Sequence, residues 1–271
     1  MRGTSAASLE QVARAFEPVL QAAGDDASTL GAQLFAVVDA LDSSGSLRRA
    51  LSDPSRDGDA KAGLASGLLA GRVDPRVVDI VSAFARARWS AEADLTEAVE
   101  QVAADAVLAG AQSAGLLAQV EDELFRLDRT LVGQRELRRA LTDRSATSEN
   151  RTALVRRLIE GKVTAPTQQL VERAAATPRG RTMATTLALL GRLAARRRQR
   201  LLAAVSTASP LTEAQVTRLR SLLENAYGRQ IQLNIALDPQ VLGGLRIQVG
   251  AEVVDSTVLA RLDDARRRLA G

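Results

Sequence analysis

The sequence predicts a mainly α-helical protein of two tandem small helical bundles, followed by a small α/β domain. Apolar residues recur at helical spacing through most of the first 200 positions. Many side chains return ninety residues later, which indicates an internal duplication with an offset of 90. Beyond that region, apolar and polar residues alternate as in half-buried strands. We therefore expect one bundle copy at 1–98, a second at 99–200 and an α/β domain at 201–271.

Composition favours helix-on-helix packing. Of the 271 residues, 46% are apolar but only 2% are aromatic, so the cores must consist mainly of Leu, Val and Ala. Leu and Ala are strong helix formers, and helices that pack on helices bury such side chains efficiently. The formal net charge is +4, and the isoelectric point is near 10.4 because nearly all the positive charge is Arg.

The first copy is expected to contain six helices after a polar tail at 1–7. Asp74 and Pro75 suit the N-cap and first position of a helix, and Gly24 and Gly71 are typical helix stops. The last helix closes the first bundle and opens the second. The expected helices run from Leu9 to Gly24, at 29–41, 46–51 and 57–70, from Pro75 through Phe84, and at 91–112. Their inward residues include Leu9, Val12, Phe16, Val19, Leu20, Leu30, Leu34, Val37, Val38 and Leu41.

The two copies match in more than the spacing of their apolar residues, which unrelated helices would also share. Arg, Gly and Asp match at one fixed offset and need no gap, so we expect two related bundles. The matching segments are Glu10-Gln11-Val12-Ala13 with Glu100-Gln101-Val102-Ala103, Leu34-Phe35 with Leu124-Phe125, and Leu47-Arg48-Arg49-Ala50-Leu51 with Leu137-Arg138-Arg139-Ala140-Leu141. Asp53, Leu64, Leu68, Gly71, Val73 and Val81 match Asp143, Leu154, Leu158, Gly161, Val163 and Val171.

The second copy continues through helices at 147–160, 164–175 and 182–203. Residues 201–206 fit either an extension of the last helix or the first strand of the terminal domain. That domain continues after Pro210 with a helix, two alternating strands, a tight reversal and a final helix. The helix face contains Val216, Leu219, Leu222, Leu223 and Tyr227. The strands carry Ile231, Leu233, Ile235 and Leu237, then Leu245, Ile247 and Val249; Val253 and Val254 follow the reversal, and Val258, Leu262, Ala265 and Leu269 form the last helical face.

Sequence motifs for catalysis are missing. The lack of Cys and His excludes disulfides, zinc fingers and nucleophilic catalysis by either residue. The chain also lacks a phosphate loop, a dinucleotide fingerprint and a nucleophile elbow. We therefore assign no catalytic, cofactor-binding or metal-binding residue and no cofactor. Asp122, Glu123 and Asp128 could form a carboxylate metal site, but an ordinary solvated face is favoured. Gly243 and Gly244 are interpreted as turn residues whose conformation Gly tolerates easily.

Several Arg clusters are candidate contact sites. Arg48-Arg49 and Arg138-Arg139 could bind a partner's carboxylates, since the guanidinium fork suits them, but solvated helix faces are favoured. The run 195–200 could bind nucleic acid or anionic lipid. It has no interleaved aromatic residues for base stacking, so a surface helix face that touches an acidic partner is preferred. The cations of that run are Arg196, Arg197, Arg198 and Arg200; Arg266, Arg267 and Arg268 are explained as favourable charge at a helix end.

The C-terminal residues resemble a known family. Three short segments carry the resemblance: Asp238-Pro239, Leu242-Gly243-Gly244-Leu245-Arg246-Ile247-Gln248-Val249-Gly250 and Val253-Val254-Asp255-Ser256-Thr257. In this order they are similar to the C-terminal signature of the δ subunit of bacterial F-type ATP synthase, the OSCP family. Ala251 stands where the family usually has Asp, and Ser256 where it usually has Gly; both positions lie in turns. The resemblance is strongest from Glu136 to Leu269, and the additional first copy resembles actinobacterial members.

The resemblance implies a non-catalytic stator, or peripheral-stalk, connector that supports proton-driven rotary ATP synthesis. Its implied partners are the N-terminal helices of the ATP synthase α subunits, for the helical part, and the C-terminal region of the b subunit, for the α/β part. The second copy, which precedes the signature directly, is expected to sit on the catalytic head, and the first copy to pack against b.

The implied location is the cytoplasmic face of the cell membrane. Contact with the membrane is expected only through the complex, because no stretch of the sequence is long and apolar enough to cross a bilayer. The alternative is an Arg-rich helical nucleic-acid-binding or adaptor protein, which the scarcity of aromatic residues and the modest net charge disfavour.

Overall fold

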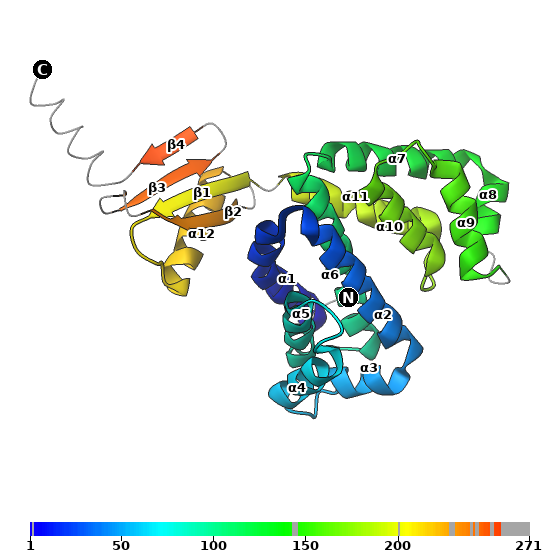
Figure 1. The fold of residues 1–271 in the computed structure, drawn as a ribbon, viewed down its shortest axis with the longest axis horizontal. Coiled ribbons are helices and arrows are strands. Elements are labelled where there is room, and N and C mark those ends of the chain that lie inside the picture. Colours follow the sequence, from blue (N-terminus) through cyan, green and yellow to red (C-terminus); the bar gives the residue numbers. More distant parts are fainter. Residues whose placement is uncertain are drawn as a thin grey trace, which may run out of the picture. The chain divides into compact units, whose positions relative to one another are not determined.

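The computed structural model describes residues 1, 3–142, 146–199, 201–227, 231–238, 241, 244–249 and 252–255. The chain forms two compact units, Met1–Ala195 and Arg196–Gly271. The first unit is helical and the second contains the sheet (Figure 1). The predicted fold class is thereby confirmed, while the further division of the helical unit at 98/99 stays a prediction.

Helices of the two copies correspond one to one along the chain. The first copy contains α1 (Thr4–Ala23), a short 3₁₀ turn (Gly24–Asp26), α2 (Ala27–Ser43), α3 (Gly45–Ser52), α4 (Gly58–Leu69), α5 (Pro75–Arg86) and α6 (Glu92–Ser113). The second continues with α7 (Leu117–Gly133), α8 (Arg135–Thr142), α9 (Ser148–Ile159), α10 (Ala165–Ala176) and α11 (Met183–Gln199). α7 to α10 begin and end ninety residues after α2 to α5, so the offset found in the sequence also governs the helix boundaries.

Caps explain several of these boundaries. The carboxylate of Asp74 accepts a hydrogen bond from the backbone N–H of Arg76 at 2.9 Å, and Pro75 begins α5, as predicted. Gly71 and Gly161 follow α4 and α9 with φ of 71° and 67°. Glycine adopts this left-handed conformation without steric cost, so both copies end the helix by the same means.

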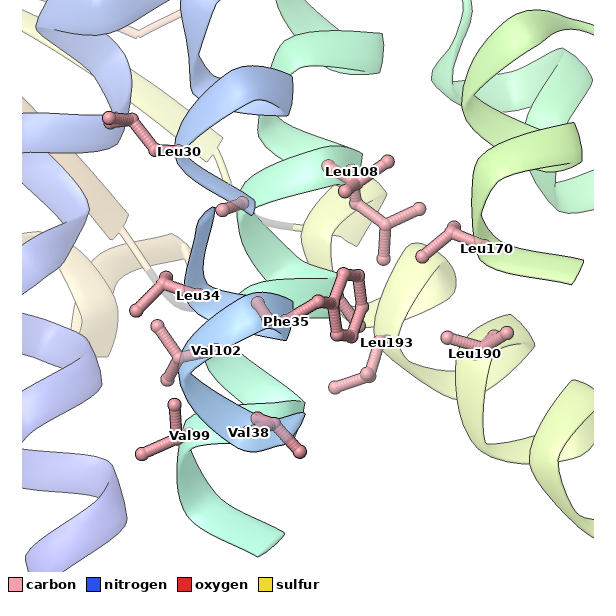
Figure 2. Packing of buried hydrophobic residues seen from close by; sticks show 14 of the residues in the cluster. Leu30, Leu34, Phe35, Val38, Val99, Val102, Leu108, Leu170, Leu190 and Leu193 are labelled. Atoms are coloured by element: carbon pink, nitrogen blue, oxygen red, sulfur yellow. The ribbon is translucent and has the colours of Figure 1, made fainter. Parts of the chain in front are cut away.

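One long helix, α6, belongs to both copies. It packs against α1, α2, α3 and α5 on one side of the duplication and against α7 and α10 on the other. Most of its residues are buried, and many of them are Ala or Val, which leaves room for helices on several sides. A continuous hydrophobic core therefore extends from α1 to α11, and Figure 2 shows part of it around Phe35, Val102, Leu108 and Leu170.

The crossing of α2 and α6 depends on glycine. A Cβ atom on Gly31 would lie 2.7 Å from Cγ2 of Val107 and 2.8 Å from the backbone oxygen of Ala103. A Cβ on Gly110 would lie 2.2 Å from Oγ of Ser28. All three separations are shorter than van der Waals contact, so these glycines permit the close approach of the two helix backbones.

One expectation for the helical unit was wrong. The segment 1–7 is not a polar tail, because α1 already begins at Thr4. Ser5 is buried there: its hydroxyl donates to the Asp94 carboxylate at 2.7 Å and accepts from the Ser90 N–H at 2.8 Å. Val19 and Leu9, by contrast, are partly buried and pack against the core, as expected for this face of α1.

The second unit contains a mixed four-stranded sheet and one described helix. The strands are β1 (Leu201–Thr207), β2 (Ile231–Leu237), β3 (Leu245–Val249) and β4 (Glu252–Asp255), in the order β2-β1-β3-β4. β1 pairs parallel with β2 and antiparallel with β3, and β3 pairs antiparallel with β4. The parallel pair needs a crossover, which α12 (Glu213–Tyr227) supplies. A separate small core contains Ala203, Val205, Leu223, Ile231, Leu233 and Ile247.

The structure resolves the ambiguity at 201–206 in favour of a strand and corrects two inward assignments. β1 lies in the middle of the sheet and forms hydrogen bonds with both neighbouring strands, so α11 ends at Gln199 and not at 203.

Two apolar residues of this unit that were expected to point inward are exposed. Leu237, the last residue of edge strand β2, is 60% exposed, and Leu222 is 59% exposed because it lies off the face of α12 marked by Leu223. Gly244 has φ of 86°, as expected of a turn glycine. Gly243 and the predicted final helix lie outside the described residues.

Candidate interaction surfaces

The paired Arg residues do not form equivalent surfaces in the two copies. Nη1 of Arg48 donates to the backbone oxygens of Leu41 at 2.7 Å and Asp42 at 3.4 Å, which closes the C-terminal end of α2. Arg49, Arg138 and Arg139 are exposed. The favoured solvated-face interpretation therefore holds for three of the four residues, whereas Arg48 has a structural role that a charge pattern does not reveal.

The run of Arg residues near 200 departs from the expected surface face. Arg196 and Arg198 are exposed, but Arg197 is only 1% exposed. A face made of consecutive residues cannot be wholly solvated on a helix, since neighbours point about 100° apart. Arg200 and the cluster Arg266 to Arg268 lie outside the described residues.

The three acidic residues considered for a metal site have different environments. Asp122 is exposed and pairs with Arg126 at 2.8 Å, Asp128 is partly exposed, and Glu123 is buried. The Glu123 carboxylate accepts hydrogen bonds from the backbone N–H of Thr164 at 3.0 Å, from its hydroxyl at 2.8 Å and from Gln119 at 2.9 Å. Within the described ranges, the structure contains no cluster of acidic residues that could hold a metal ion. Glu123 is a helix cap supplied from another helix, not part of a solvated face.

Burial and hydrogen bonding act on Glu123 in opposite directions. Burial alone raises the pKa of its carboxyl group, but hydrogen bonds from Thr167, Thr164 and Gln119 outweigh burial and hold the pKa below its usual value. The carboxylate is therefore ionised at neutral pH and carries a negative charge at the N-terminus of α10, where the helix dipole favours it.

At both ends of α5 and of α10, backbone groups form hydrogen bonds with side chains that lie at matching positions of the repeat. Gln33, ninety residues before Glu123, accepts from the backbone N–H of Asp74 at 2.7 Å at the start of α5. Lys61 donates to the backbone oxygen of Ala87 at 3.3 Å just after α5. Its counterpart, Arg151, donates to the backbone oxygens of Ala175 at 2.9 Å and Ala176 at 3.1 Å at the end of α10. The side chains differ between copies, but the helix ends that they satisfy are the same.

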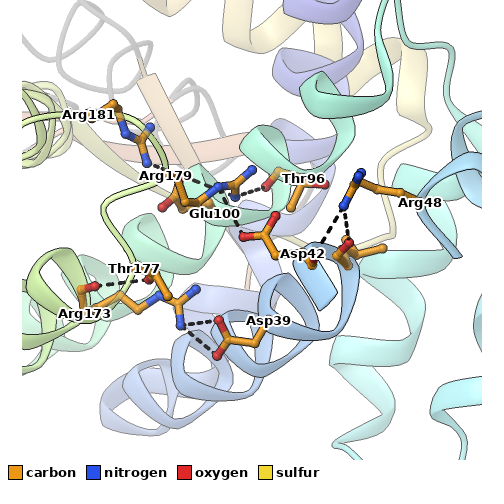
Figure 3. A network of polar contacts seen from close by, with 10 residues as sticks. Asp39, Asp42, Arg48, Thr96, Glu100, Arg173, Thr177, Arg179 and Arg181 are labelled. Atoms are coloured by element: carbon orange, nitrogen blue, oxygen red, sulfur yellow. Dashed lines mark hydrogen bonds and ion pairs between the residues drawn. The ribbon is translucent and has the colours of Figure 1, made fainter. Parts of the chain in front are cut away.

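The two copies are joined by an ion pair that lies beside an aromatic ring. Nη1 of Arg173 in α10 lies 2.7 Å and 2.8 Å from the two carboxylate oxygens of Asp39 in α2 (Figure 3). The same guanidinium lies 4.9 Å from the ring centroid of Phe35, within the range of a cation–π contact. Figure 2 shows Phe35 beside Leu190 and Leu193. α2 of the first copy is thus docked on α10 and α11 of the second.

A second polar group extends this contact through the turn between α10 and α11. Nε of Arg179 lies 3.3 Å from the Asp42 carboxylate, and its Nη1 lies 3.7 Å from that of Glu100. Arg181 also pairs with Glu100 (Figure 3). Arg179 has φ of 50°, which is uncommon for a residue other than Gly. These cations hold the turn against both α2 and α6.

Among the helices that the structure describes, none is both long and apolar enough to cross a membrane.

Comparison with known proteins then decides the family. The family model "ATP synthase delta (OSCP) subunit" matches residues 99–269. The chain belongs to the ATP synthase delta (OSCP) subunit family. The match begins with the second copy and runs through the α/β unit, which are the parts that carry the C-terminal resemblance.

Relatives extend this similarity over the first copy as well. ATP synthase subunit delta of Beutenbergia cavernae is 56% identical over 271 residues and covers 100% of both chains. That of Kineococcus radiotolerans is 46% identical over 269 residues, 99% of this chain and 98% of its own. That of Thermobifida fusca is 45% identical over 271 residues and covers 100% of both. These sources are actinobacteria, so the predicted type of δ/OSCP chain is confirmed.

As a δ/OSCP family member, the chain is a non-catalytic component of the peripheral stalk, or stator, of ATP synthase. The alternative, an Arg-rich nucleic-acid-binding or adaptor protein, gains no support from these comparisons.

Proposed function

We propose that this chain connects the catalytic head of an F-type ATP synthase to its b-subunit stalk. The helical unit binds N-terminal helices of the α subunits, and the α/β unit binds the C-terminal region of b. The chain lies on the cytoplasmic face of the cell membrane, which it reaches only through the complex. The similarity to ATP synthase δ subunits over the whole of both chains carries this proposal.

The mechanical part of the proposal is resistance to torque. A stator must hold the head still while the rotor turns, so its connector must not bend where force passes through it. The shared helix α6, the continuous core and the Arg173–Asp39 pair support such stiffness in the helical unit. Affinity for partner helices would come from apolar contacts, with the Arg residues at the rim setting register and association rate.

The second copy is proposed to sit on the head and the first to pack against b. Support comes from the family model, whose match begins at residue 99 and includes the second copy and the α/β unit. This part of the chain preserves the order of a helical bundle followed by an α/β unit.

Two experiments test these proposals. Affinity purification of the chain from a detergent extract of membranes should recover α, β and b chains at moderate salt. Recovery of nucleic acid in their place, with a steep dependence on salt, would overturn the connector role. Site-specific crosslinkers near Leu47 and Leu137 distinguish the copies: a product with α from Leu137 is expected, and a product with α from Leu47 alone would reverse the assignment.

A further inference from the structure

Helix α7 exposes an aromatic ring among cations. Phe125 is 59% exposed, and the guanidinium of Arg129 lies 5.8 Å from its ring centroid. Arg126, the residue after Phe125, is exposed and pairs with Asp122. A single exposed apolar side chain is ordinary by itself, so the meaning of this ring depends on its counterpart in the first copy.

That counterpart is a docking residue. Phe35 occupies the same position of α2, ninety residues earlier, and is only 7% exposed. It is covered by helices of the other copy, with Leu170, Leu190 and Leu193 beside it and Arg173 over its ring (Figure 2). The duplicated element thus uses this position to attach to a pair of helices, and α7 presents the same ring without such a cover among the described residues.

The charge next to the ring is inverted between the copies. Asp39 follows Phe35 by four residues and pairs with Arg173, whereas Arg129 follows Phe125 by four residues. No carboxylate in the described part of the chain forms an ion pair with Arg129. The complement of the α7 surface is therefore a helix that carries Leu-type side chains for the ring and a carboxylate in the place of Arg173.

We propose that Phe125, Arg126 and Arg129 form a docking surface for an acidic amphipathic helix of another protein. A second copy of this chain does not supply that complement, because the position in α5 that corresponds to Arg173 is Ala83. An α7-to-α5 contact between two copies would bring no carboxylate to Arg129 from that position. The inference rests on the connector role and deepens it, since it specifies one surface and the chemistry of the segment that covers it.

The test uses a photo-crosslinking residue in the assembled complex. p-Benzoylphenylalanine replaces Phe125 and retains an aromatic ring; the matched control replaces Leu158, which is 40% exposed on α9 of the same copy. After irradiation of the purified complex, the crosslinked peptide is identified by mass spectrometry. The expected product from position 125 is one segment of another chain with apolar residues at helical spacing and a net negative charge, and position 158 does not yield it.

Charge variants of Arg129 supply the second measurement. Arg129→Glu should lower the yield of that product about tenfold, which corresponds to about 1.4 kcal/mol of binding, while Arg129→Lys should retain it. Arg129→Gln serves as a second variant if the reversal alters folding, which the unfolding temperature reports.

Absence of a product at position 125, a product without carboxylates, a product from a second copy of this chain, or a yield unaffected by both variants would overturn the proposal. If the chain still purifies with α, β and b in that case, the connector role stands and only the surface assignment fails.

Discussion

The carboxylate of Glu123 accepts a hydrogen bond from the backbone N–H of Thr164 at 3.0 Å. Glu123 lies on α7 and Thr164 precedes α10, so the bond fixes the start of one helix to the side of another. The equivalent residues of the first copy, Gln33 and Asp74, are joined by the same bond at 2.7 Å. A neutral amide and a charged carboxylate therefore perform one structural task at the same place of the repeat.

Removal of this cap should destabilise the helical unit. Glu123→Ala leaves the Thr164 donors without their acceptor in a buried place, so we expect a loss of about 2 kcal/mol in the free energy of unfolding. Glu123→Gln should cost less, since the first copy uses Gln there. Asp122→Ala, at the exposed neighbour, should change stability by less than about 0.5 kcal/mol. Urea denaturation of the three variants provides the measurement, and equal losses for Ala at both positions would contradict the assigned role.

The same carboxylate predicts a pH dependence. Because the pKa of Glu123 in the folded chain is held below its value of 4.5 in the unfolded chain, the unfolded state binds the proton more readily. The stabilisation is fully present above pH 4.5 and is lost as pH falls through the lower folded value. The stability difference between the wild type and Glu123→Gln should therefore shrink from pH 7 toward pH 3, as measured by denaturation at each pH. A difference that grows on acidification would refute the lowered pKa.

Replacement of Gly by Ala should change the free energy of unfolding in opposite directions at a helix crossing and at an exposed helix position. At Gly31 the added Cβ would meet Val107 and a backbone oxygen of α6, so Gly31→Ala should cost about 1–3 kcal/mol through overpacking. At Gly63, on the exposed side of α4, no atom lies within 4 Å of the added Cβ. There Gly63→Ala should stabilise the protein by about 0.5–1 kcal/mol, because Ala has less freedom to lose on folding. Thermal unfolding followed by circular dichroism measures both, and stabilisation by Gly31→Ala would disprove the close crossing.

The contact between the copies should be measurable as a coupling between Arg173 and Asp39. Arg173→Ala is expected to cost about 2 kcal/mol, because it removes the ion pair and the cation–π contact with Phe35 together. In a double-mutant cycle with Asp39→Ala, the pair should contribute about 0.5–1 kcal/mol, since Asp39 is half exposed and screened by water.

That coupling should decrease in 1 M NaCl, where exposed charges are screened over short distances. The matched control is the exposed Arg14–Glu10 pair on α1, for which the coupling should be at most about 0.5 kcal/mol. Equal coupling for both pairs would show that Arg173 does not join the copies in solution.

Most helices were predictable because their signals are local. The N-cap at Asp74, the stop at Gly71 and the apolar face of α2 depend on residues a few positions apart, and the duplication confirmed each element by its counterpart. The strand at 201–207 was undecided, because a short apolar segment after a long helix has no local feature that tells strand from helix. Its pairing with β2 and β3 decides it, and those partners are distant in sequence.

The contacts between the copies could not be predicted from one sequence. Arg173 and Asp39 are 134 residues apart, and nothing in the neighbourhood of either residue identifies the other. Glu123 was considered only with its acidic neighbours, since both Thr164 donors that it caps lie 41 residues later in the chain. A comparison of the copies offered one signal: both Gln33 and Glu123 can accept hydrogen bonds, at matched positions.

The shared helix α6 limits how such a chain can vary. A bundle of six helices, repeated with one helix in common, adds five helices for each period of ninety residues and leaves no linker between the units. The helix α6 therefore contributes to two packing arrangements at once, so a substitution of one of its buried residues is tolerated only if both arrangements accept its size. Neither bundle can be removed by cutting the chain at one loop, because the last helix of one is the first helix of the other.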